Sequence, residues 1–557
     1  MVRVLIPALL SALVGCGGGA QDDGRMPAVL ITLDTTNPNA LDVYGTDREL
    51  TPHLAGLAAE GVVYERARAV TPLTMPSHSS MLTGLYPVRH TVRDNAWLPL
   101  PASADTLAER ATAAGFRTAA FLAASVLRRS YGLDQGFELY DEAPRAGART
   151  GQLGERRARA VTDAALGWLD GRDGLEPYFL WVHYFDAHAP YDPPPPALAR
   201  AEGRPYLGEV AFMDEQIGRL LERLRSEPDW ERTMVLVVAD HGEGAGRHGE
   251  STHGMLAYDS TLAVPMFVRF PGGGRAGERS QEVTSLVDVY PTMLAAMGLS
   301  VPPGIDGLDL GSGPVPPDRG VYFESYYGYL NYGWAPLSGW ADSTSKYIHG
   351  SKPQLFAAED SGEERDLFRV DDPRVGRARA KIERLAERPR LERAEQELSV
   401  SSQDGLTELG YAGAASAEAP IPEPLEDSSL PAPREAMPEH YRSWEALAMA
   451  DAGRLPQAIE TLREITEGNP GNAFAHDRLG ELLLRAGRAE EALVPLLAMV
   501  ERGLERPNLR LNLTKAYAQL GRYEEALAEA RRFNELSPND PEGERIVQDL
   551  LEALEER

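Results

Sequence analysis

Thr74 lies where a hydroxyl can act as a nucleophile. Pro76 follows two residues later, and proline suits the first turn of a helix, where no backbone N–H is needed. The sequence therefore predicts a helix beginning near Thr74, with its hydroxyl beside unpaired helix N–H groups and the positive end of the helix dipole. Such a place binds a tetrahedral oxyanion readily. Taken alone, the stretch is more typical of an ordinary N-cap threonine.

Acidic and histidine side chains follow two apolar runs that are typical of buried strands. Residues 28–33 lead directly into Asp34, and residues 234–239 lead into Asp240 and His241. Ligands of open α/β sheets bind beyond the carboxyl ends of the strands, so we expect these side chains where chemistry usually occurs. They offer hard oxygen and borderline nitrogen donors and are therefore candidate ligands of a divalent metal. A lone Asp-His-Gly is more often a capped turn, but several such strand ends favour a metal site.

A third apolar run, residues 178–185, leads into Asp186 and His188. His253 lies in the loop that follows the pair Asp240 and His241. An aspartate and a histidine leaving one strand end can hold a metal or a substrate oxygen. We therefore count Asp186, His188 and His253 as candidate site residues.

Separate blocks, in the same order along the chain, resemble the sulfatases of the alkaline phosphatase superfamily. Residues 71–84 resemble the family's C/S-x-P-x-R segment, and residues 240–254 resemble its D-H-G-x block with a later H-G or K-G. The resemblance covers roughly residues 27–412. It implies an α/β fold: an alkaline-phosphatase-like sandwich with a central, mostly parallel sheet, helices on both faces and a small C-terminal α+β subdomain.

The resemblance also implies residue roles. The family's nucleophile corresponds to Thr74, its leading metal ligand to Asp34, and the asparagine that donates to the oxyanion to Asn95. The sequence departs from the family at His78, which takes the place of an arginine. It departs again at Asn37 and Asn39, which replace an arginine and a second acid.

These residues suggest metal-assisted in-line displacement at an ester. One divalent cation, held by Asp34, Asp240 and His241, would activate the Thr74 hydroxyl, which is itself a possible ligand. The histidines favour zinc or manganese over calcium or magnesium, with one ion or two.

The remaining candidates serve the ester. Asn95 and His78 would donate to the developing charge. His188 and His253, with Asp186, would either hold a second metal or bind the ester and protonate its leaving group.

The single cysteine of the chain, Cys16, constrains the substrate. Most sulfatases derive a formylglycine from cysteine, and its hydrate expels sulfate by reverting to an aldehyde. Thr74 cannot do so, and an intermediate on its hydroxyl must be hydrolysed directly. The chemistry therefore favours a phosphate mono- or diester or a phosphonate, whereas the overall resemblance favours a sulfate ester. The substrate would be an envelope glycan, a lipid or a small molecule.

The elements that position these residues alternate between helices and strands. We expect helices over 51–61, 106–114 and 204–226 and a strand over 117–122. This alternation is typical of an α/β fold.

The first residues resemble a bacterial lipoprotein signal. Arg3 precedes a short apolar run that ends at Cys16, the expected lipidation site, so we expect a signal peptide over 1–16 and a flexible tether over 17–26. The protein would then be lipid-anchored at the periplasmic face of the cell envelope, at the outer membrane, with no other membrane contact. A formal charge of −28 argues against nucleic-acid binding through a general basic face.

The C-terminal part differs in composition. Residues 413–438 are rich in Ala, Pro, Glu and Ser and predict a linker between the hydrolase domain (27–412) and the segment 439–557. In that segment Gly453, Gly487 and Gly521 recur at the 34-residue period of tetratricopeptide repeats. Such an all-α array usually binds a protein or peptide in a concave groove.

Two further functions compete with ester hydrolysis. One is a periplasmic scaffold in which the hydrolase domain is inactive and the repeats bind a partner. The other is a transferase that moves a phosphoryl-linked head group onto an envelope glycan or lipid.

Overall fold

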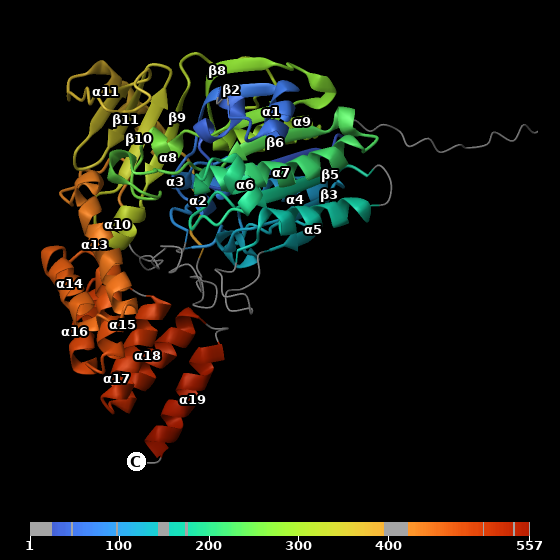
Figure 1. Ribbon diagram of the computed structural model, residues 1–557. Coiled ribbons are helices and arrows are strands. Elements are labelled where there is room, and N and C mark those ends of the chain that lie inside the picture. Colours follow the sequence, from blue (N-terminus) through green and yellow to red (C-terminus); the bar gives the residue numbers. More distant parts are fainter. Residues whose placement is uncertain are drawn as a thin grey trace, which may run out of the picture.

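The computed structural model describes residues 25–45, 48–95, 98–142, 155–172, 176–394, 421–504, 506–537 and 541–555. The expected signal peptide, with Cys16, and most of the expected tether lie outside the described residues. The described chain forms an α/β region followed by a helical region (Figure 1). None of the described helices is both long enough and apolar enough to cross a membrane.

An eight-stranded sheet with the order β4-β3-β5-β1-β6-β7-β2-β8 forms the centre of the α/β region. Its strands are β1 (Ala28–Leu33), β2 (Val62–Arg68), β3 (Arg117–Phe121), β4 (Leu139–Asp141), β5 (Tyr178–Tyr184), β6 (Met234–Ala239), β7 (Met266–Arg269) and β8 (Glu278–Ser285). Neighbouring strands are parallel except at β7, which runs antiparallel to β6 and β2. The central strands β1, β5 and β6 are buried along their whole length, as expected of strands covered on both faces.

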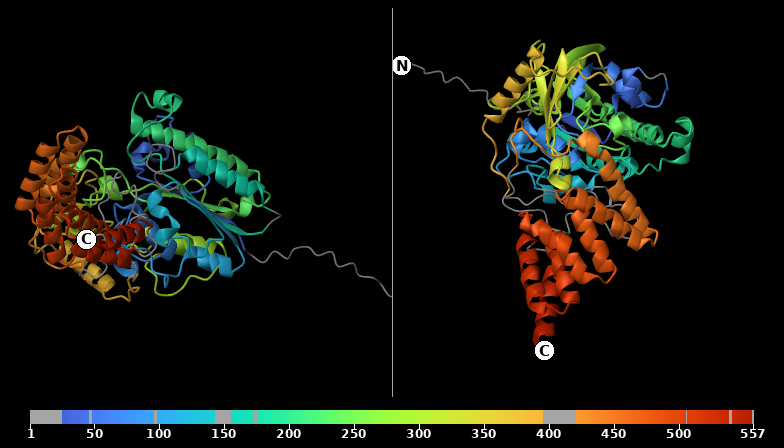
Figure 2. Two further views of the ribbon diagram at one scale, coloured as in Figure 1. Left: turned by 90° about the horizontal axis from the view of Figure 1, so that it is seen from below. Right: turned by 90° about the vertical axis from the view of Figure 1, so that its left-hand side faces the viewer.

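Helices cover both faces of this sheet (Figure 2). One layer contains α1 (Pro52–Ala59), α5 (Ala158–Asp170), α6 (Pro195–Arg200) and α7 (Pro205–Arg225). The other contains α2 (Thr74–Thr83), α4 (Leu107–Ala113) and α9 (Val289–Ala296). Two short helices, α3 (Pro87–His90) and α8 (Asp259–Leu262), lie in the connections. The expected α/β sandwich with a mostly parallel sheet is thus confirmed, and α1, α4, β3 and α7 lie within the ranges expected for them.

A second sheet follows the first in the chain. It is antiparallel, with the order β12-β11-β10-β9. Its strands and helices are β9 (Gly320–Ser325), α10 (Tyr327–Tyr332), β10 (Leu337–Asp342), β11 (Ser345–His349), β12 (Gln354–Ala357) and α11 (Pro373–Ala386). Helix α11 packs on β10 and β11, which closes this small α+β unit.

The helical region consists of helices that pack on their neighbours in the chain. They are α13 (Pro433–Asp451), α14 (Leu455–Gly468), α15 (Ala473–Arg485), α16 (Ala489–Glu501), α17 (Pro507–Gln519), α18 (Tyr523–Leu536) and α19 (Pro541–Glu555). Gly453, Gly487 and Gly521 follow α13, α15 and α17 with φ values of 77°, 71° and 70°. This left-handed conformation favours glycine and explains its periodic recurrence at these turns.

The segment 413–438 differs from the linker expected there. Residues 413–420 lie outside the described residues, but α13 already begins at Pro433. Before it, the carbonyl groups of Pro422 and Pro431 accept hydrogen bonds from the Tyr326 hydroxyl and the Ala335 N–H. The described part of this segment is therefore fixed to the α/β region by backbone contacts, which composition does not show.

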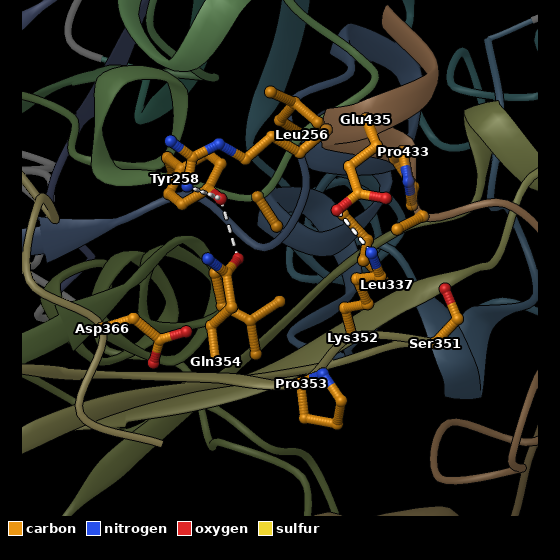
Figure 3. A pocket seen from close by; sticks show the side chains of 14 residues that line it. Leu256, Tyr258, Leu337, Ser351, Lys352, Pro353, Gln354, Asp366, Pro433 and Glu435 are labelled. Carbon is orange, nitrogen blue, oxygen red and sulfur yellow. Dashed lines mark hydrogen bonds and ion pairs between the residues drawn. The ribbon is translucent and has the colours of Figure 1, made fainter.

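The helical region shares a core with the α/β region. Met437 of α13 and Phe474 of α15 are 3% and 1% exposed and belong to the same apolar cluster as the main sheet. The Phe474 ring stacks on Tyr332 of α10 with ring centres 5.4 Å apart. Beside the start of α13 lies a pocket of about 390 Å³, where Lys352 pairs with Glu435 (Figure 3).

Candidate active site

The ends of β1 and β6 bring Asp34 and Asp240 together. These strands are parallel neighbours, with Leu33 opposite Ala239, so the next residue of each lies at the same edge of the sheet. Both aspartates are fully buried. Asp240 Oδ1 accepts hydrogen bonds from the N–H groups of His241 and Thr35 at 2.7 and 3.2 Å. The position of Asp240 is thus set by backbone donors that follow both strands.

His241 connects this pair to Thr74. Its Nδ1 lies 3.0 Å from the carbonyl oxygen of Gly242, which can only accept, so Nδ1 carries the ring proton and Nε2 is an acceptor. The Thr74 hydroxyl lies 3.2 Å from that Nε2 and can donate to it. Thr74 is the first residue of α2, so the helix start directs its side chain to the metal-site candidates.

The donor set fits a divalent cation. Both carboxylate oxygens of Asp34 and one of Asp240 are buried without a hydrogen-bond partner, and with His241 they offer ligand atoms within 4.8 Å of one another. Burial, together with the charge of Asp240, raises the pKa of Asp34 well above its usual value. Burial raises the pKa of Asp240 to about 6. A cation offsets the cost of burying these two charges together.

His183, on β5, lies beside Asp34. The Thr32 hydroxyl accepts the indole N–H of Trp181 at 2.9 Å and lies 2.9 Å from His183 Nδ1. His183 Nε2 lies 3.3 Å from Asp34 Oδ2, and both atoms are buried without a hydrogen-bond partner. His183 therefore places a further ring nitrogen beside the candidate metal ligands.

We expected unpaired N–H groups at the start of α2, but two of these groups have hydrogen-bond acceptors. The N–H of Met75 donates to Asn95 Oδ1 at 2.8 Å, and that of Ser77 donates to the carbonyl of Leu73. These two N–H groups are therefore paired, one with the Asn95 side chain, which follows α2 in the sequence, and one with Leu73 just before the helix. The side-chain N–H2 of Asn95 is buried without a partner, which leaves it as a donor at the same helix end.

His78 makes a different contact from the one expected of it. Its Nδ1 lies 2.8 Å from the carbonyl oxygen of Thr74, so its single ring proton is used there. Burial lowers the pKa of His78, and a neutral ring has no second N–H to offer to a developing charge. In this structure His78 therefore fixes the backbone at Thr74 rather than serving as an oxyanion donor.

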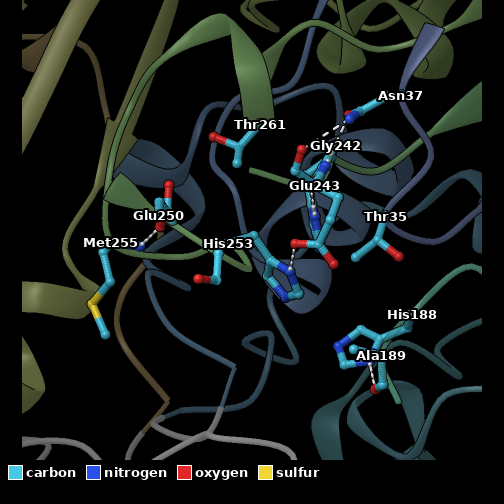
Figure 4. A network of polar contacts seen from close by, with 12 residues as sticks. Thr35, Asn37, His188, Ala189, Gly242, Glu243, Glu250, His253, Met255 and Thr261 are labelled. Atoms are coloured by element: carbon cyan, nitrogen blue, oxygen red, sulfur yellow. Dashed lines mark hydrogen bonds and ion pairs between the residues drawn. The ribbon is translucent and has the colours of Figure 1, made fainter. Parts of the chain in front are cut away.

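His253 lies beside His241, and His188 lies beside His253. The ring centre of His253 is 4.4 Å from that of His241 and 5.1 Å from that of His188. Glu243 lies 3.4 Å from His253 Nδ1, and His188 Nδ1 faces the carbonyl of Ala189 (Figure 4). Burial lowers the pKa of His188 to about 3 and that of His253 to about 4, so both rings are neutral near pH 7.

Asp186 does not join the candidate metal ligands. One of its carboxylate oxygens accepts the N–H of Ala158 at 2.7 Å, at the start of α5. The other lies 3.2 Å from Arg157 Nε. Asp186 thus caps a helix and pairs with an arginine, a role that its place at a strand end does not reveal.

Sequence reasoning missed His183 and Glu243. A histidine inside an otherwise apolar strand is a signal for His183, but its contact with Asp34 follows from the pairing of Thr32 with His183 in the sheet. Glu243 stands next to the Asp-His-Gly motif. Its backbone is held by Asn37, whose side chain accepts the Glu243 N–H and donates to its carbonyl, both at 2.8 Å.

A buried nucleophile candidate beside two aspartates and a histidine, on an alkaline-phosphatase-like sheet, defines the class of metal-dependent ester hydrolases. Residues 28–299 match the model of the sulfatase family. The family and the relatives named below are ester hydrolases, and this chain is one of them.

Two curated relatives show the extent of the likeness. The chain is 26% identical over 434 residues to an ulvan-active sulfatase of Formosa agariphila, covering 70% of this chain and 83% of that protein. It is 26% identical over 351 residues to an N-acetylgalactosamine-6-sulfatase of Homo sapiens, covering 53% and 67%. Among solved structures, the phosphonate monoester hydrolase of Agrobacterium radiobacter shares the fold, with a TM-score of 0.54 at 21% identity, covering 65% and 95%.

Proposed function

We propose that the protein hydrolyses a phosphate mono- or diester or a phosphonate, with the Thr74 hydroxyl as nucleophile. The observation that carries the proposal is the 3.2 Å approach of Thr74 Oγ1 to His241 Nε2, within the buried group that includes Asp34 and Asp240. If Nε2 held the cation, it could not also accept from Thr74, and the hydroxyl would then lie beside the cation that activates it.

A divalent cation at Asp34, Asp240 and His241 would lower the pKa of the Thr74 hydroxyl and offset the charge on a non-bridging ester oxygen. The imidazole ligand favours zinc or manganese over calcium or magnesium. His183 Nε2, which lies 3.3 Å from Asp34 Oδ2, would offer a further nitrogen beside this site.

The remaining residues act on the ester. The Asn95 side-chain N–H2, which has no protein partner, would donate to the oxygen that gains charge. His188 and His253 would contact the leaving group of the ester. An anionic ester beside these rings favours the imidazolium form, so one of them would gain a proton on substrate binding and pass it to the leaving oxygen.

The identity of the nucleophile favours phosphorus over sulfur. A threonine ester of either acid lacks the second hydroxyl through which a formylglycine hydrate expels sulfate. Its hydrolysis needs a water attacking the ester centre directly, aided by the same donors. The second candidate is a sulfate ester, and the names of the relatives, which include an ulvan-active sulfatase, favour a sulfated glycan in that case.

A substrate panel tests the proposal. The purified protein, loaded with zinc or manganese, is assayed against an aryl phosphate, a phosphodiester, a phosphonate monoester and an aryl sulfate. We expect turnover of at least one phosphorus ester. Thr74→Ala should lower it by about 10³-fold or more, and Thr74→Ser should retain part of it.

Mass spectrometry of the quenched reaction should find a phosphoryl group on the peptide that contains Thr74. Turnover that survives Thr74→Ala would contradict the nucleophile assignment. Turnover of the sulfate alone would favour the second candidate. Good transfer to an added alcohol with poor hydrolysis would favour a transferase.

We also propose that the protein is anchored in the bacterial envelope through a lipid on Cys16. The basis is the signal-like sequence before this residue. Incorporation of labelled palmitate that is absent from Cys16→Ala would support it, and equal incorporation would contradict it.

For the helical region we propose a tetratricopeptide array that binds a peptide. The 34-residue glycine period and the fully buried alanines Ala458, Ala492 and Ala526 between paired helices support this proposal. Enrichment of defined peptides from a synthetic library by the full chain tests it, and uniform recovery would contradict it.

A further inference from the structure

The loop that carries His253 has a backbone conformation that needs support. It spans residues 244–256 and follows Glu243. Within it Ala245 and His248, which have side chains, adopt φ values of 50° and 52°, and Gly246 and Gly249 adopt 83° and 86°. Positive φ is unfavourable for a residue with a side chain. This loop therefore depends on contacts that hold it in place.

Part of that support lies within the loop. The N–H of Gly244 donates to the carbonyl of Thr252 at 2.7 Å, and the N–H of Gly246 donates to that of Glu250 at 2.8 Å. The buried Glu250 side chain accepts the N–H of Met255 at 2.8 Å. Inside the turn at 247–251, the N–H groups of Arg247 and Glu250 donate to the carbonyls of Gly244 and Arg247, both at 2.9 Å. The carbonyl of Gly249 and the N–H of Ser251 instead bind a partner outside the loop.

Helix α13 of the helical region holds that turn. The Tyr441 hydroxyl donates to the carbonyl of Gly249 at 2.7 Å and accepts the N–H of Ser251 at 2.8 Å. On the other side of the turn, the His248 ring stacks on Tyr258 with ring centres 3.8 Å apart. The guanidinium group of Arg434, also from α13, lies 5.8 Å from the centre of the Tyr258 ring. One helix thus contacts the turn directly and through its aromatic neighbour.

We propose that Tyr441 is a positioning residue of the active site. By bridging Gly249 and Ser251, it fixes the turn so that His253, two residues further on, stays beside His241. The helical region is then a structural part of the catalytic centre, in addition to the peptide binding proposed for it above. The role of His253 at the ester rests on the proposed function. The contact of Tyr441 with the loop is independent of that function.

Tyr441→Phe, in the full-length protein, removes only the bridging hydroxyl. Amide hydrogen exchange over residues 245–255 should become about ten-fold faster, as expected for the loss of about one net hydrogen bond. Tyr517→Phe is the matched control, because Tyr517 belongs to the core of the helical region and lies under Arg522. It should leave exchange over 245–255 unchanged.

A double-mutant cycle tests the link to His253. Tyr441→Phe should lower kcat/KM about ten-fold in the wild-type background and less than about two-fold in the His253→Ala background, since coupled residues are not additive. Unchanged exchange in Tyr441→Phe would overturn the proposal whatever the activity. Equal losses in both backgrounds would overturn the role of His253 in it. A protein that turns over no ester would contradict the proposed function, while the exchange experiment still decides whether Tyr441 holds the loop.

Discussion

At the residue scale, the chemistry of the site depends on which polar side-chain atoms remain without a hydrogen-bond partner in the protein. The carbonyl of Gly242 accepts a hydrogen bond from His241 Nδ1, so Nε2 is an acceptor for Thr74. The N–H of Met75 donates to Asn95 Oδ1, so the side-chain N–H2 of Asn95 remains as a donor. Backbone groups thus decide which side-chain atoms are available for chemistry.

Asp240→Asn should lower the affinity for zinc or manganese by more than about 100-fold. Even the loss of a residue that only supports a metal ligand lowers metal affinity by about 10- to 100-fold. The substitution keeps the shape of the side chain but removes the charge that the cation would offset. Metal content after dialysis and competition with a chelating dye measure the effect. Asp214→Asn is the control, since Asp214 is also buried but caps α1 through the N–H groups of His53 and Leu54. Equal metal loss in both variants would contradict the assignment.

Glu250 predicts a pH dependence of stability. Burial raises its pKa to about 8, and the N–H groups of Met255 and Leu256 offset only part of this effect. Because the pKa is higher in the folded than in the unfolded state, the folded protein holds the proton longer. The contribution of Glu250 to stability is therefore fully present below about pH 4.5 and is lost as pH rises to about 8.

Glu250→Gln removes this titration. At pH 8 its free energy of unfolding should exceed that of the wild type by on the order of a few kcal/mol, and at pH 5 the two should be similar. Urea unfolding at both pH values measures the difference. A constant difference across this range would show that Glu250 does not titrate there.

The sequence predicted Asp34, Asp240 and His241 because a strand end can be recognised from a buried apolar run followed by a polar residue. It did not predict the contact of His183 with Asp34, which depends on β5 lying beside β1 in one register. Nor did it predict the orientation of His78, because the acceptor of its ring proton is a backbone carbonyl four residues earlier.

At the element scale, the edge of the sheet where β1, β5 and β6 end collects the site, and α2 supplies its nucleophile candidate. These strands were predicted well because each is almost entirely apolar, with Thr32 in β1 and His183 in β5 as polar exceptions. The start of α13 was not, because proline-rich composition hides a helix whose first turn contains Pro433. Proline is favourable at that position and unfavourable further inside.

Asp186→Ala tests whether Asp186, which follows β5, caps a helix or binds the metal. Because Asp186 accepts the N–H of Ala158 at the start of α5, the variant should lose about 1 kcal/mol of stability or more. Its metal content should equal that of the wild type. Thermal unfolding and metal analysis measure the two effects, and a fall in metal content would instead make Asp186 a ligand.

At the scale of the whole molecule, the two regions form one body through a shared core. Phe474 and Met437 are buried against the α/β region, and Asn469 donates to the carbonyl of Tyr332 at 2.9 Å. Neither contact follows a repeat period, so the sequence predicted two regions but not their interface.

Phe474→Ala should lower the free energy of unfolding by about 3–5 kcal/mol. It should also separate the melting of the helical region from that of the α/β region, because the residue packs against both. Differential scanning calorimetry would then show two transitions where the wild type shows one. Phe533→Ala is the control, since Phe533 is equally buried but lies beside Gly543 within the helical region. Two transitions in this control as well would contradict the interface as their cause.

The bridge from Tyr441 to the 244–256 loop has a consequence for the timing of biosynthesis. Tyr441 stands 190 residues after Ser251 in the chain. At about 5–20 residues per second, translation supplies it roughly 10–40 s after the loop has been made. A nascent or prematurely terminated chain thus contains Thr74 and the metal-site candidates but lacks the hydroxyl that fixes the loop. On this proposal the site is finished only when α13 has been made and has docked, so a chain that ends before Tyr441 should be less active than one that includes this helix.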